Sequence, residues 1–507
     1  MTLARIHTRA ALGIEAPYVT VEAHISAGLP ALTIVGLPET TVKEARDRVR
    51  SAIINSGYTF PARKITINLA PADLPKEGGR YDLPIAIALL AASQQLSATA
   101  LSQYEFIGEL ALTGALRGVP GAISSAIQAN NARRQIIVPQ DNEDEAGLLE
   151  GADCYIAATL LEVCAILEGK QTPTRPRPPA PASSSNHTAD LQDVIGQEQG
   201  KRALEIGAAG GHNLLLIGPP GTGKTMLATR LIGLLPPLTL SEALESAAIR
   251  SMVDNRSLTD SWRQRPFRSP HHSASINAMV GGGRIPAPGE ISLANNGVLF
   301  LDELPHFDRR ALDALREPIE TGEIHISRTR AKIRYPARFQ LIAAMNPSPA
   351  GHYQGEHNRS SPEQTLRYLS RLSGPFLDRF DITLEIPLLA SGMISQPPAG
   401  GESSTTVRKR VIAARQRQEI RQHKLNALLT GPEVKAVCML EQADAIWLEE
   451  AITQLGLSIR AWQRVLKVAR TIADLASEEQ LSRQHLQEAL SYRAMDRLLI
   501  HLQQQLA

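Results

Sequence analysis

Cysteines and aromatic residues are scarce in this chain of 507 residues. The cysteines are Cys154, Cys164 and Cys438, and an odd, scattered set of this kind excludes a disulfide framework and is typical of unpaired thiols in a reducing cytoplasm. Phenylalanine, tryptophan and tyrosine together make up 4% of the residues, so stacking platforms for single-stranded bases are not abundant.

Long apolar runs and a strong net charge are also missing. No stretch approaches the roughly 18 uncharged apolar residues that a membrane-spanning helix needs, and Glu15 interrupts the opening segment where a secretory signal would require an apolar core. The formal net charge is +2, so any affinity for nucleic acid has to come from local patches. The composition predicts a globular cytoplasmic chain, long enough for about three domains.

Two segments rich in proline, glycine and serine divide the chain. Residues 170–190 have no apolar period and predict an extended linker, and a weaker break of the same kind covers residues 391–406. We therefore expect an N-terminal domain over residues 1–169, a central domain over residues 191–390 and a helical C-terminal domain over residues 407–507.

The segment NLLLIGPPGTGKTMLATRLIGLL predicts a buried strand, a glycine-rich loop and a helix. Its loop matches the pattern G-x-x-x-x-G-K-[ST], in which backbone N–H groups surround phosphates and the helix N-terminus favours the anion. The lysine of the pattern reaches the terminal phosphates, and its threonine offers a hydroxyl to Mg²⁺. The nucleotide-binding residues expected from this pattern are Gly218, Pro219, Pro220, Gly221, Thr222, Gly223, Lys224 and Thr225.

A second apolar strand, predicted over residues 298–301, ends in Asp302 and Glu303. Strands of a parallel sheet deliver polar residues at their carboxyl ends, beside the phosphate loop. Asp302 is therefore expected to hold Mg²⁺ and Glu303 to polarise the attacking water. A third strand ends in Asn346, which is placed to orient that water. Together these residues predict an ATPase with ATP and Mg²⁺ as its cofactors.

The order of the phosphate loop, VLFLDE, AAMNP and GPFLDRFD resembles that of an AAA+ ATPase of the Mg-chelatase-like branch. More narrowly, FRSPHHSASINAMVGGGRIPAPGEISLANNGVLFLDELPHF is similar to the ComM/YifB family, and the resemblance covers essentially the whole chain. It implies an α/β fold class with an N-terminal Lon-protease-like α+β domain, a central AAA+ P-loop αβα sandwich and a C-terminal helical lid. It also implies a homohexameric ring motor. In the ComM members such a motor moves branched DNA, with helicase or branch-migration activity, during recombination of incoming DNA, and recombination proteins are candidate partners.

The resemblance also implies roles for two arginines. Arg379, in SGPFLDRFD, corresponds to the arginine finger that reaches into the neighbouring subunit's site, where a guanidinium stabilises charge on the γ-phosphate oxygens. The alternative is a structural ion pair with Asp378 or Asp381. Arg460, at the head of a lid helix, matches the second sensor arginine, although other arginines of that helix compete for the assignment.

The candidate DNA-binding element is a β-hairpin, which alternating apolar and polar residues predict over residues 323–340. By the resemblance, this hairpin faces the pore of the ring, and phosphate contacts there are independent of sequence and sensitive to salt. The alternatives are a solvated basic hairpin and a subunit contact. Five basic residues, with no acid between them in the sequence, are expected to place positive charge near the tip: Arg328, Arg330, Lys332, Arg334 and Arg338.

A second basic stretch, residues 407–424, predicts an amphipathic helix with arginines on its solvent-facing side. Such a helix is usually only a solvated surface, and DNA contact is the alternative.

Histidines occur in pairs at two places where a metal site has to be considered. At His271 and His272 we expect no metal site, because adjacent residues on a strand point to opposite faces; a structural or loop role is favoured. Many relatives have closely spaced cysteines after the Asn-Pro near residue 346, but this chain has only His352 and His357 there. Two histidines without thiolates are a poor tetrahedral zinc set, so we expect no structural metal.

The Lon-protease-like domain lacks the residues of a Ser–Lys dyad. The turn that would hold the nucleophile contains Arg80, Tyr81 and Asp82, and the segment VPGAISSA has no lysine to activate Ser124 or Ser125. We therefore expect the domain to be catalytically inert and to act in docking, as a collar or as a DNA guide.

Three functions remain open. The basic hairpin favours a DNA-translocating ATPase. A metal-chelatase motor subunit is less favoured, because this chain lacks a fused metal-binding domain and such subunits are not expected to carry a Lon-like domain. A protein-remodelling AAA+ factor would be marked by an aromatic pore loop, and no clear one is found.

Overall fold

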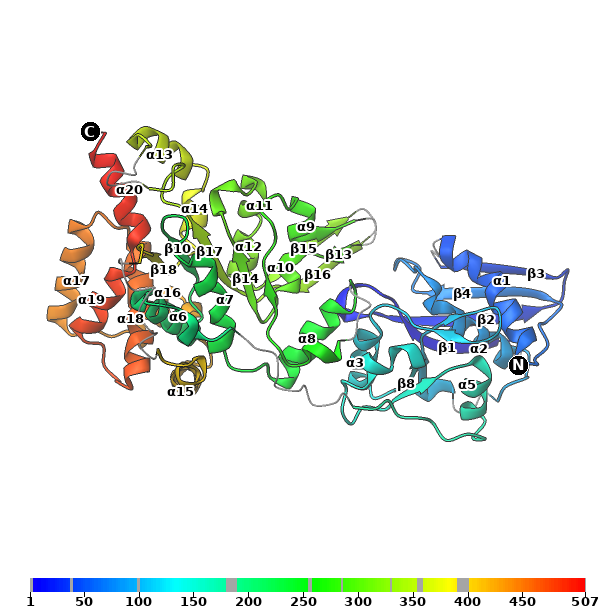
Figure 1. The fold of residues 1–507 in the computed structure, drawn as a ribbon. Helices are drawn as coiled ribbons and strands as arrows, with labels where there is room; N and C mark the ends of the chain where they lie inside the picture. The colour runs from blue at the N-terminus through cyan, green and yellow to red at the C-terminus, as the bar shows by residue number, and fades with distance from the viewer. Residues whose placement is uncertain are drawn as a thin grey trace.

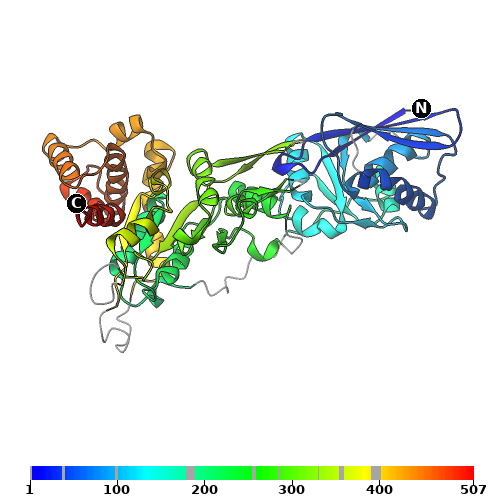
Figure 2. The same cartoon turned by 90° about the horizontal axis from the view of Figure 1, so that it is seen from above.

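The structure, a computed structural model, describes residues 3–36, 40–97, 101–178, 189–253, 258–283, 286–328, 331–352, 359–389 and 401–506. Figures 1 and 2 show an elongated molecule, with the N-terminal strands at one end, a central α/β part and a group of C-terminal helices at the other end. Among the described residues, no helix is both long and apolar enough to cross a membrane.

The N-terminal unit (residues 3–178) is built on a seven-stranded mixed sheet with the order β3-β4-β2-β1-β5-β8-β9. The alternation of buried and exposed residues along β2 shows one face turned to a core. Helix α2, Asp82–Ala92, is buried along its whole length and contacts β1 and β2. The strands are β1 Leu3–Arg9, β2 Tyr18–Ser26, β3 Ala31–Val35, β4 Lys64–Ala70, β5 Tyr104–Phe106, β8 Gln135–Pro139 and β9 Cys154–Ala157, and the other main helices are α1 Thr40–Asn55, α3 Ala122–Asn131 and α5 Leu160–Leu167.

The central part is a five-stranded parallel sheet with the order β11-β14-β17-β10-β18. Its strands are apolar on both faces: along β10, Leu214 and Leu216 face one core, whereas Leu215 and Ile217 face another. The bounds are β10 Leu214–Ile217, β11 Phe267–Arg268, β14 Val298–Leu301, β17 Gln340–Met345 and β18 Ile382–Glu385, with helices α6 Glu198–Gly210, α7 Lys224–Leu234 and α8 Leu240–Arg250 beside them.

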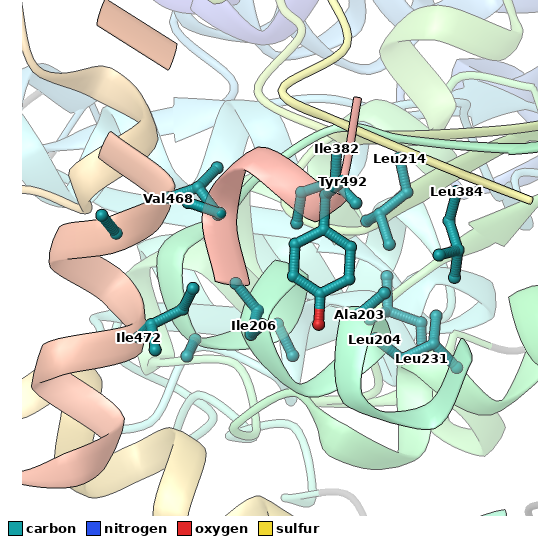
Figure 3. Close-up of a cluster of buried hydrophobic side chains, with 14 of the residues drawn as sticks. Ala203, Leu204, Ile206, Leu214, Leu231, Ile382, Leu384, Val468, Ile472 and Tyr492 are labelled. Atoms are coloured by element: carbon teal, nitrogen blue, oxygen red, sulfur yellow. The ribbon is translucent and has the colours of Figure 1, made fainter. Parts of the chain in front are cut away.

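The C-terminal helices pack on both faces of this sheet: α15 to α19 contribute to the core that contains Leu214, and α13, α14 and α20 contribute to the core that contains Leu215. Figure 3 shows side chains from α6, β10, β18 and α18 gathered around the ring of Tyr492. Helix α20 contacts β18 and α13. The helices are α13 Pro362–Leu369, α14 Gly374–Leu377, α15 Ser404–Gln422, α16 Gly431–Val437, α17 Gln442–Gln454, α18 Ile459–Ala476, α19 Arg483–Ser491 and α20 Ala494–Gln504.

Two arginines of α15 do not face solvent as the sequence predicted. The helix forms, but Arg408 Nε donates to Gly233 O over 2.7 Å, and Arg415 Nε donates to Ala208 O over 2.8 Å. Both carbonyls lie in the last turns of helices, where backbone acceptors lack intrahelical partners and attract cations. The prediction that these side chains face solvent was therefore wrong, because they fasten α15 to α6 and α7.

Two hairpins extend from the central part toward the N-terminal unit (Figures 1 and 2). The larger one confirms the predicted hairpin, and its buried face holds Ile324, Ile326, Ile333 and Tyr335. Between β11 and β14 the chain forms α9 Ile276–Val280, the small hairpin of β12 Gly281–Gly282 and β13 Ala287–Pro288, and α10 Glu290–Leu293. The larger hairpin consists of β15 Glu323–Arg328 and β16 Ala331–Pro336, and it follows α11 Arg309–Asp313 and α12 Arg316–Thr321.

Among the described residues, the N-terminal unit contacts the central part through an apolar cluster and through the larger hairpin. An apolar cluster joins Ile123 and Leu148 to Ala247 and Ala248 of α8. At the base of the larger hairpin, a guanidinium nitrogen of Arg334 lies 3.3 Å from a carboxylate oxygen of Glu15.

Candidate functional site

A cavity of about 730 Å³ opens at the carboxyl ends of the central strands, next to the loop between β10 and α7. Two loop glycines, Gly221 and Gly223, have φ angles of +77° and +83°, which only glycine adopts without strain. Gly218 lies so close to β18 that an added Cβ would meet Ile386 O at 2.3 Å. The lining residues are Pro220, Gly221, Thr222, Gly223, Lys224, Thr225, Ser269, Pro270, His271, His272, Asp302, Glu303, His306, Met345, Asn346 and Tyr368.

Lys224, the first residue of α7, is turned toward the loop itself. Its Nζ donates to Gly218 O over 2.7 Å, to Pro219 O over 2.8 Å and to Asn346 Oδ1 over 3.3 Å. Burial lowers the pKa of Lys224, and Asp302 opposes that shift. In this structure the Lys224 ammonium is therefore bound to backbone carbonyls of the loop. The sequence pattern predicts that the same ammonium binds the terminal phosphates of a nucleotide.

Thr225 and Asp302 meet across the cavity from different elements. The Thr225 Oγ1 donates to Asp302 Oδ2 over 2.7 Å. A hydroxyl and a carboxylate at this separation supply oxygen donors of the kind that Mg²⁺ takes, so the residues present fit the ion.

Glu303 follows Asp302 with a left-handed backbone, φ 53° and ψ 46°, which is uncommon for a residue with a side chain. Its N–H donates to Asp302 Oδ1 over 2.9 Å, and its side chain is 59% exposed. Its Oε2 lies 3.3 Å from Nδ1 of His272. The carboxylate therefore lies at the rim of the cavity, against an imidazole.

The two adjacent histidines were misplaced by the sequence analysis. They lie in the loop after β11 and not on a strand, so the alternation of a strand does not turn their side chains to opposite faces. The centres of the His271 and His272 rings lie 4.1 Å apart. His306 follows at 5.9 Å from His272. The signal that could have found them is their place: β11 pairs in parallel with β14, so the residues after both strands meet at one sheet edge.

Arg379 and Arg460 are not among the lining residues of the cavity. The Arg379 guanidinium pairs with Glu320 of α12, not with Asp378 or Asp381. Asp378 instead pairs with the lid helix α18, with Oδ2 3.5 Å from Arg460 Nη1 and Oδ1 2.7 Å from Arg464 Nη2. Arg460 and Arg379 thus pair with different carboxylates, and neither contributes to the cavity beside this chain's own phosphate loop.

The larger hairpin carries less free charge than its sequence suggests. Lys332 is exposed, whereas Arg330 and the side chain of Arg328 lie outside the described residues. Arg334 pairs with Glu15 and Glu323, and Arg338 pairs with Glu245. No acid stands between these basic residues in the sequence, but the fold brings acids to Arg334 and Arg338 from the start of the same hairpin and from other segments.

In the N-terminal unit, polar side chains fill the turn that resembles a nucleophile turn. Arg80 is buried and donates from Nη2 to Pro120 O over 3.1 Å. The Asp82 carboxylate accepts hydrogen bonds from Arg48, at 2.7 and 3.1 Å, and from the N–H of Leu110 at 3.2 Å. Burial raises the pKa of Asp82 to about 6, and Arg48 opposes the shift. These residues serve packing and ion pairing.

The hydroxyls near that turn have no base beside them in the described structure. Ser124 and Ser125 lie in the first turn of α3, and neither Oγ has a hydrogen-bond partner among the described residues. Lys76 donates from Nζ to the carbonyl of Gly36 over 2.9 Å and also to that of Pro71.

Metal-binding side chains do not gather elsewhere: within the described ranges, no group of three or more His, Cys, Asp or Glu residues is arranged to hold an ion. His357, which the sequence analysis considered together with His352, lies outside these ranges. All the cysteines are unpaired and buried.

Comparison with known proteins accounts for nearly the whole chain. Family models match in three places: magnesium chelatase, subunit ChlI, at residues 190–394; subunit ChlI of Mg-chelatase at residues 21–142; and the ChlI C-terminal model at residues 401–493. The chain is 72% identical over 503 residues to the uncharacterized protein YifB of Escherichia coli, covering 99% of both. It is 57% identical to the competence protein ComM of Haemophilus influenzae, covering 98% of this chain and 99% of that one. A more distant relative is the magnesium-chelatase 38 kDa subunit of Cereibacter sphaeroides, 28% identical over 38% of this chain and 57% of its own. With a phosphate loop, strand-end acids and full-length relatives of this kind, the chain belongs to the Mg-chelatase-like ComM/YifB family.

Proposed function

We propose that this chain is an ATP-hydrolysing motor that acts on DNA. ATP hydrolysis is supported by one observation: five polar residues line a single cavity at the carboxyl edge of a parallel sheet. They are Lys224, Thr225, Asp302, Glu303 and Asn346. These residues come from two strand ends and one helix start, and their side chains are those that phosphoryl transfer to water uses. Membership in an AAA+ family suggests the same activity.

Each residue has a task in this proposal. Lys224 leaves its loop carbonyls to bind the terminal phosphates, and the N–H groups of the loop bind the remaining phosphate oxygens. Thr225 and Asp302 would hold Mg²⁺, which supplies charge neutralisation to the phosphates when bound. Glu303 polarises the attacking water, and Asn346 orients it from the end of β17.

The proposed assembly is a homohexameric ring with its active sites between subunits. Arg379 is the finger and Arg460 the second sensor, and both act on the nucleotide of the neighbouring subunit. Support comes from their position, because neither lines the cavity of its own chain: Arg379 pairs with Glu320, and Arg460 pairs with Asp378, the residue before Arg379. A finger supplied in trans makes hydrolysis depend on assembly.

The proposed substrate is branched or single-stranded DNA, bound without regard to sequence through Arg328, Arg330 and Lys332 of the larger hairpin. The name of the 57% identical relative, competence protein ComM, supports a role with incoming DNA. Among such roles, the one we favour is branch migration during recombination, with recombination proteins as partners. The unpaired cysteines support a cytoplasmic location.

For the architecture we propose an inert Lon-protease-like domain (1–169), a linker (170–190), the ATPase core (191–390), a second connecting segment (391–406), whose last residues form the start of α15, and a helical lid (407–507). The contacts of Ile123 and Leu148 with α8 support a docking role for the first domain.

The experiment that tests this proposal is the movement of a four-way DNA junction by the full chain with ATP and Mg²⁺. We expect ATP-dependent movement and salt-dependent DNA binding. In an Arg328→Ala, Arg330→Ala, Lys332→Ala variant, the salt slope should flatten by roughly one unit for each phosphate that is no longer neutralised. The likeness to a magnesium-chelatase subunit motivates a second candidate, a motor that remodels a protein partner. A chain that binds no DNA and hydrolyses ATP only with such a partner would favour that candidate.

A further inference from the structure

A second cavity, of about 780 Å³, lies between α8 and the segment that leads into β11, and the proposed mechanism does not use it. Among the described residues, it shares no lining residue with the cavity beside the phosphate loop. Figure 1 shows α8 between the central sheet and the N-terminal unit. A cavity of this volume is in the range that takes a ligand of nucleotide size.

The side chains that line this second cavity are more basic than acidic. Among the described residues of the lining, four are arginines and one, Asp260, is an acid. Two of the arginines are compensated by acids from outside the lining, because Arg265 pairs with Glu242 at 3.4 Å and Arg268 pairs with Glu290 at 2.6 Å. The charge that is open to a ligand therefore comes from the other two arginines.

These two arginines are Arg250 and Arg263. Arg250 ends α8, and its Nη1 donates to the hydroxyl of Ser261, a neutral partner that leaves the charge of the guanidinium in place. Arg263 is exposed and follows the short helix η6, Thr259–Ser261. The Arg263 backbone is left-handed, with φ +61°, which is uncommon for a residue with a side chain and is concentrated at binding sites. Two guanidinium groups of this kind suit phosphate oxygens.

The residue before Arg263 adds an aromatic ring to the same lining. Trp262 packs against the apolar cluster that joins α8 to the N-terminal unit, and it is half-buried. The cluster therefore holds the indole ring in place while part of the ring stays accessible. A fixed aromatic ring beside guanidinium groups is the combination on which a base stacks while its phosphates are bound.

We propose that this cavity binds a single strand of DNA, with a base stacked on Trp262 and neighbouring phosphates bound by Arg250 and Arg263. This inference rests on the proposed function, since it adds a second DNA contact to that of the larger hairpin. A strand is favoured over a free nucleotide because α8 also contacts the base of that hairpin, where Glu245 pairs with Arg338. Since α8 has 11 residues and is about 16 Å long, a few nucleotides span the distance.

The first measurement follows the fluorescence of Trp262 in the full chain without ATP. Changing Trp447 and Trp462 to phenylalanine leaves Trp262 as the only tryptophan, and phenylalanine keeps a ring at both partly buried positions. Titration with an oligothymidylate should quench the remaining fluorescence, because a base stacked on an indole quenches its emission. The quenching should follow the fraction of labelled oligonucleotide bound, as measured by fluorescence anisotropy.

The second measurement is the dissociation constant of the same oligonucleotide at several salt concentrations. Trp262→Ala should weaken binding roughly five- to 100-fold, the loss typical of one stacked base, whereas Trp262→Phe keeps a ring and should lose much less. Arg263→Ala should flatten the salt slope by about 0.7 of a unit, the value for one phosphate of a single strand, and Arg263→Lys should keep the slope. Arg46→Ala removes an exposed arginine of α1 and is the matched control, with the parent's affinity and slope.

Three outcomes would contradict the inference, and they are distinguishable. Thymidine monophosphate engages a single phosphate and should quench Trp262 only at far higher concentrations; an affinity equal to that of the oligonucleotide would overturn the assignment to a strand. An absence of quenching, with the parent's affinity in Trp262→Ala and the parent's slope in Arg263→Ala, would remove the cavity from the DNA path and leave binding by the larger hairpin untouched. A parent that binds no oligonucleotide contradicts the DNA part of the proposed function together with this inference.

Discussion

The proposed trans action of Arg379 makes a quantitative prediction for an Arg379→Ala variant. Subunits with this change should bind ATP as the parent does, because Arg379 does not line the cavity. Hydrolysis should fall by about 10³-fold or more, the loss typical of a missing arginine finger. Stability should barely change, since the partner carboxylate of Glu320 is 58% exposed and an ion pair of that exposure contributes at most about 1 kcal/mol.

Mixing two inactive variants tests whether the arginine acts across subunits. Lys224→Ala subunits lack a working phosphate loop but keep Arg379, and Arg379→Ala subunits have the opposite defect. In a head-to-tail ring assembled at random from equal amounts, about one interface in four pairs an intact loop with an intact finger. The mixture should therefore recover up to about a quarter of the parent's rate, and more at higher total protein concentration as rings assemble.

The assay is steady-state ATP hydrolysis by each variant alone and by the mixture, with particle size measured in parallel. Arg117→Ala, which removes an exposed arginine of the N-terminal unit, is the control and should behave like the parent. If mixed rings form and exchange subunits but recover no activity, the reasoning about a trans finger is refuted.

Three further predictions concern single sites. Glu303→Gln should bind ATP but lose most hydrolysis, whereas Lys224→Ala should lose nucleotide binding itself, as titration with a fluorescent ATP analogue would report. Because burial raises the pKa of Asp82 to about 6, this carboxyl binds more proton in the folded chain than in the unfolded chain between about pH 4 and pH 6. In urea unfolding, the stability of the parent relative to Asp82→Asn should accordingly fall as pH rises through that window. Replacing Ser124 and Ser125 by alanine should leave ATP hydrolysis unchanged, and the purified parent should not cleave unfolded casein; ATP-dependent cleavage that survives repurification would contradict an inert domain.

Much of the fold could be predicted because its signals are local. The apolar strands before the phosphate loop and before Asp302 are short, buried and bounded by glycine or charge, so composition and length identify them. The alternation of residues 323–340 likewise predicted the hairpin and its buried face. Both signals depend on neighbouring residues alone.

The pairings between distant segments could not be predicted, because a charged side chain does not carry the identity of its partner. Arg379 pairs with Glu320 although Asp378 and Asp381 are nearer in the sequence, and Arg334 pairs with the distant Glu15 as well as with Glu323. Arg415 reaches a carbonyl at the end of α6, a contact that depends on how two helices pack. Pairings of this kind follow from packing and become visible only in the folded chain.

The central claim is that this chain is a motor driven by ATP and engaged by DNA. Its most direct test is the rate of ATP hydrolysis by the full chain with and without a four-way DNA junction, in the parent and in the variant with Arg328, Arg330 and Lys332 changed to alanine. The account predicts that the junction raises the parent's rate and that the variant keeps the DNA-free rate without responding. A parent rate that is the same with and without the junction, at salt concentrations where the DNA is bound, would contradict it.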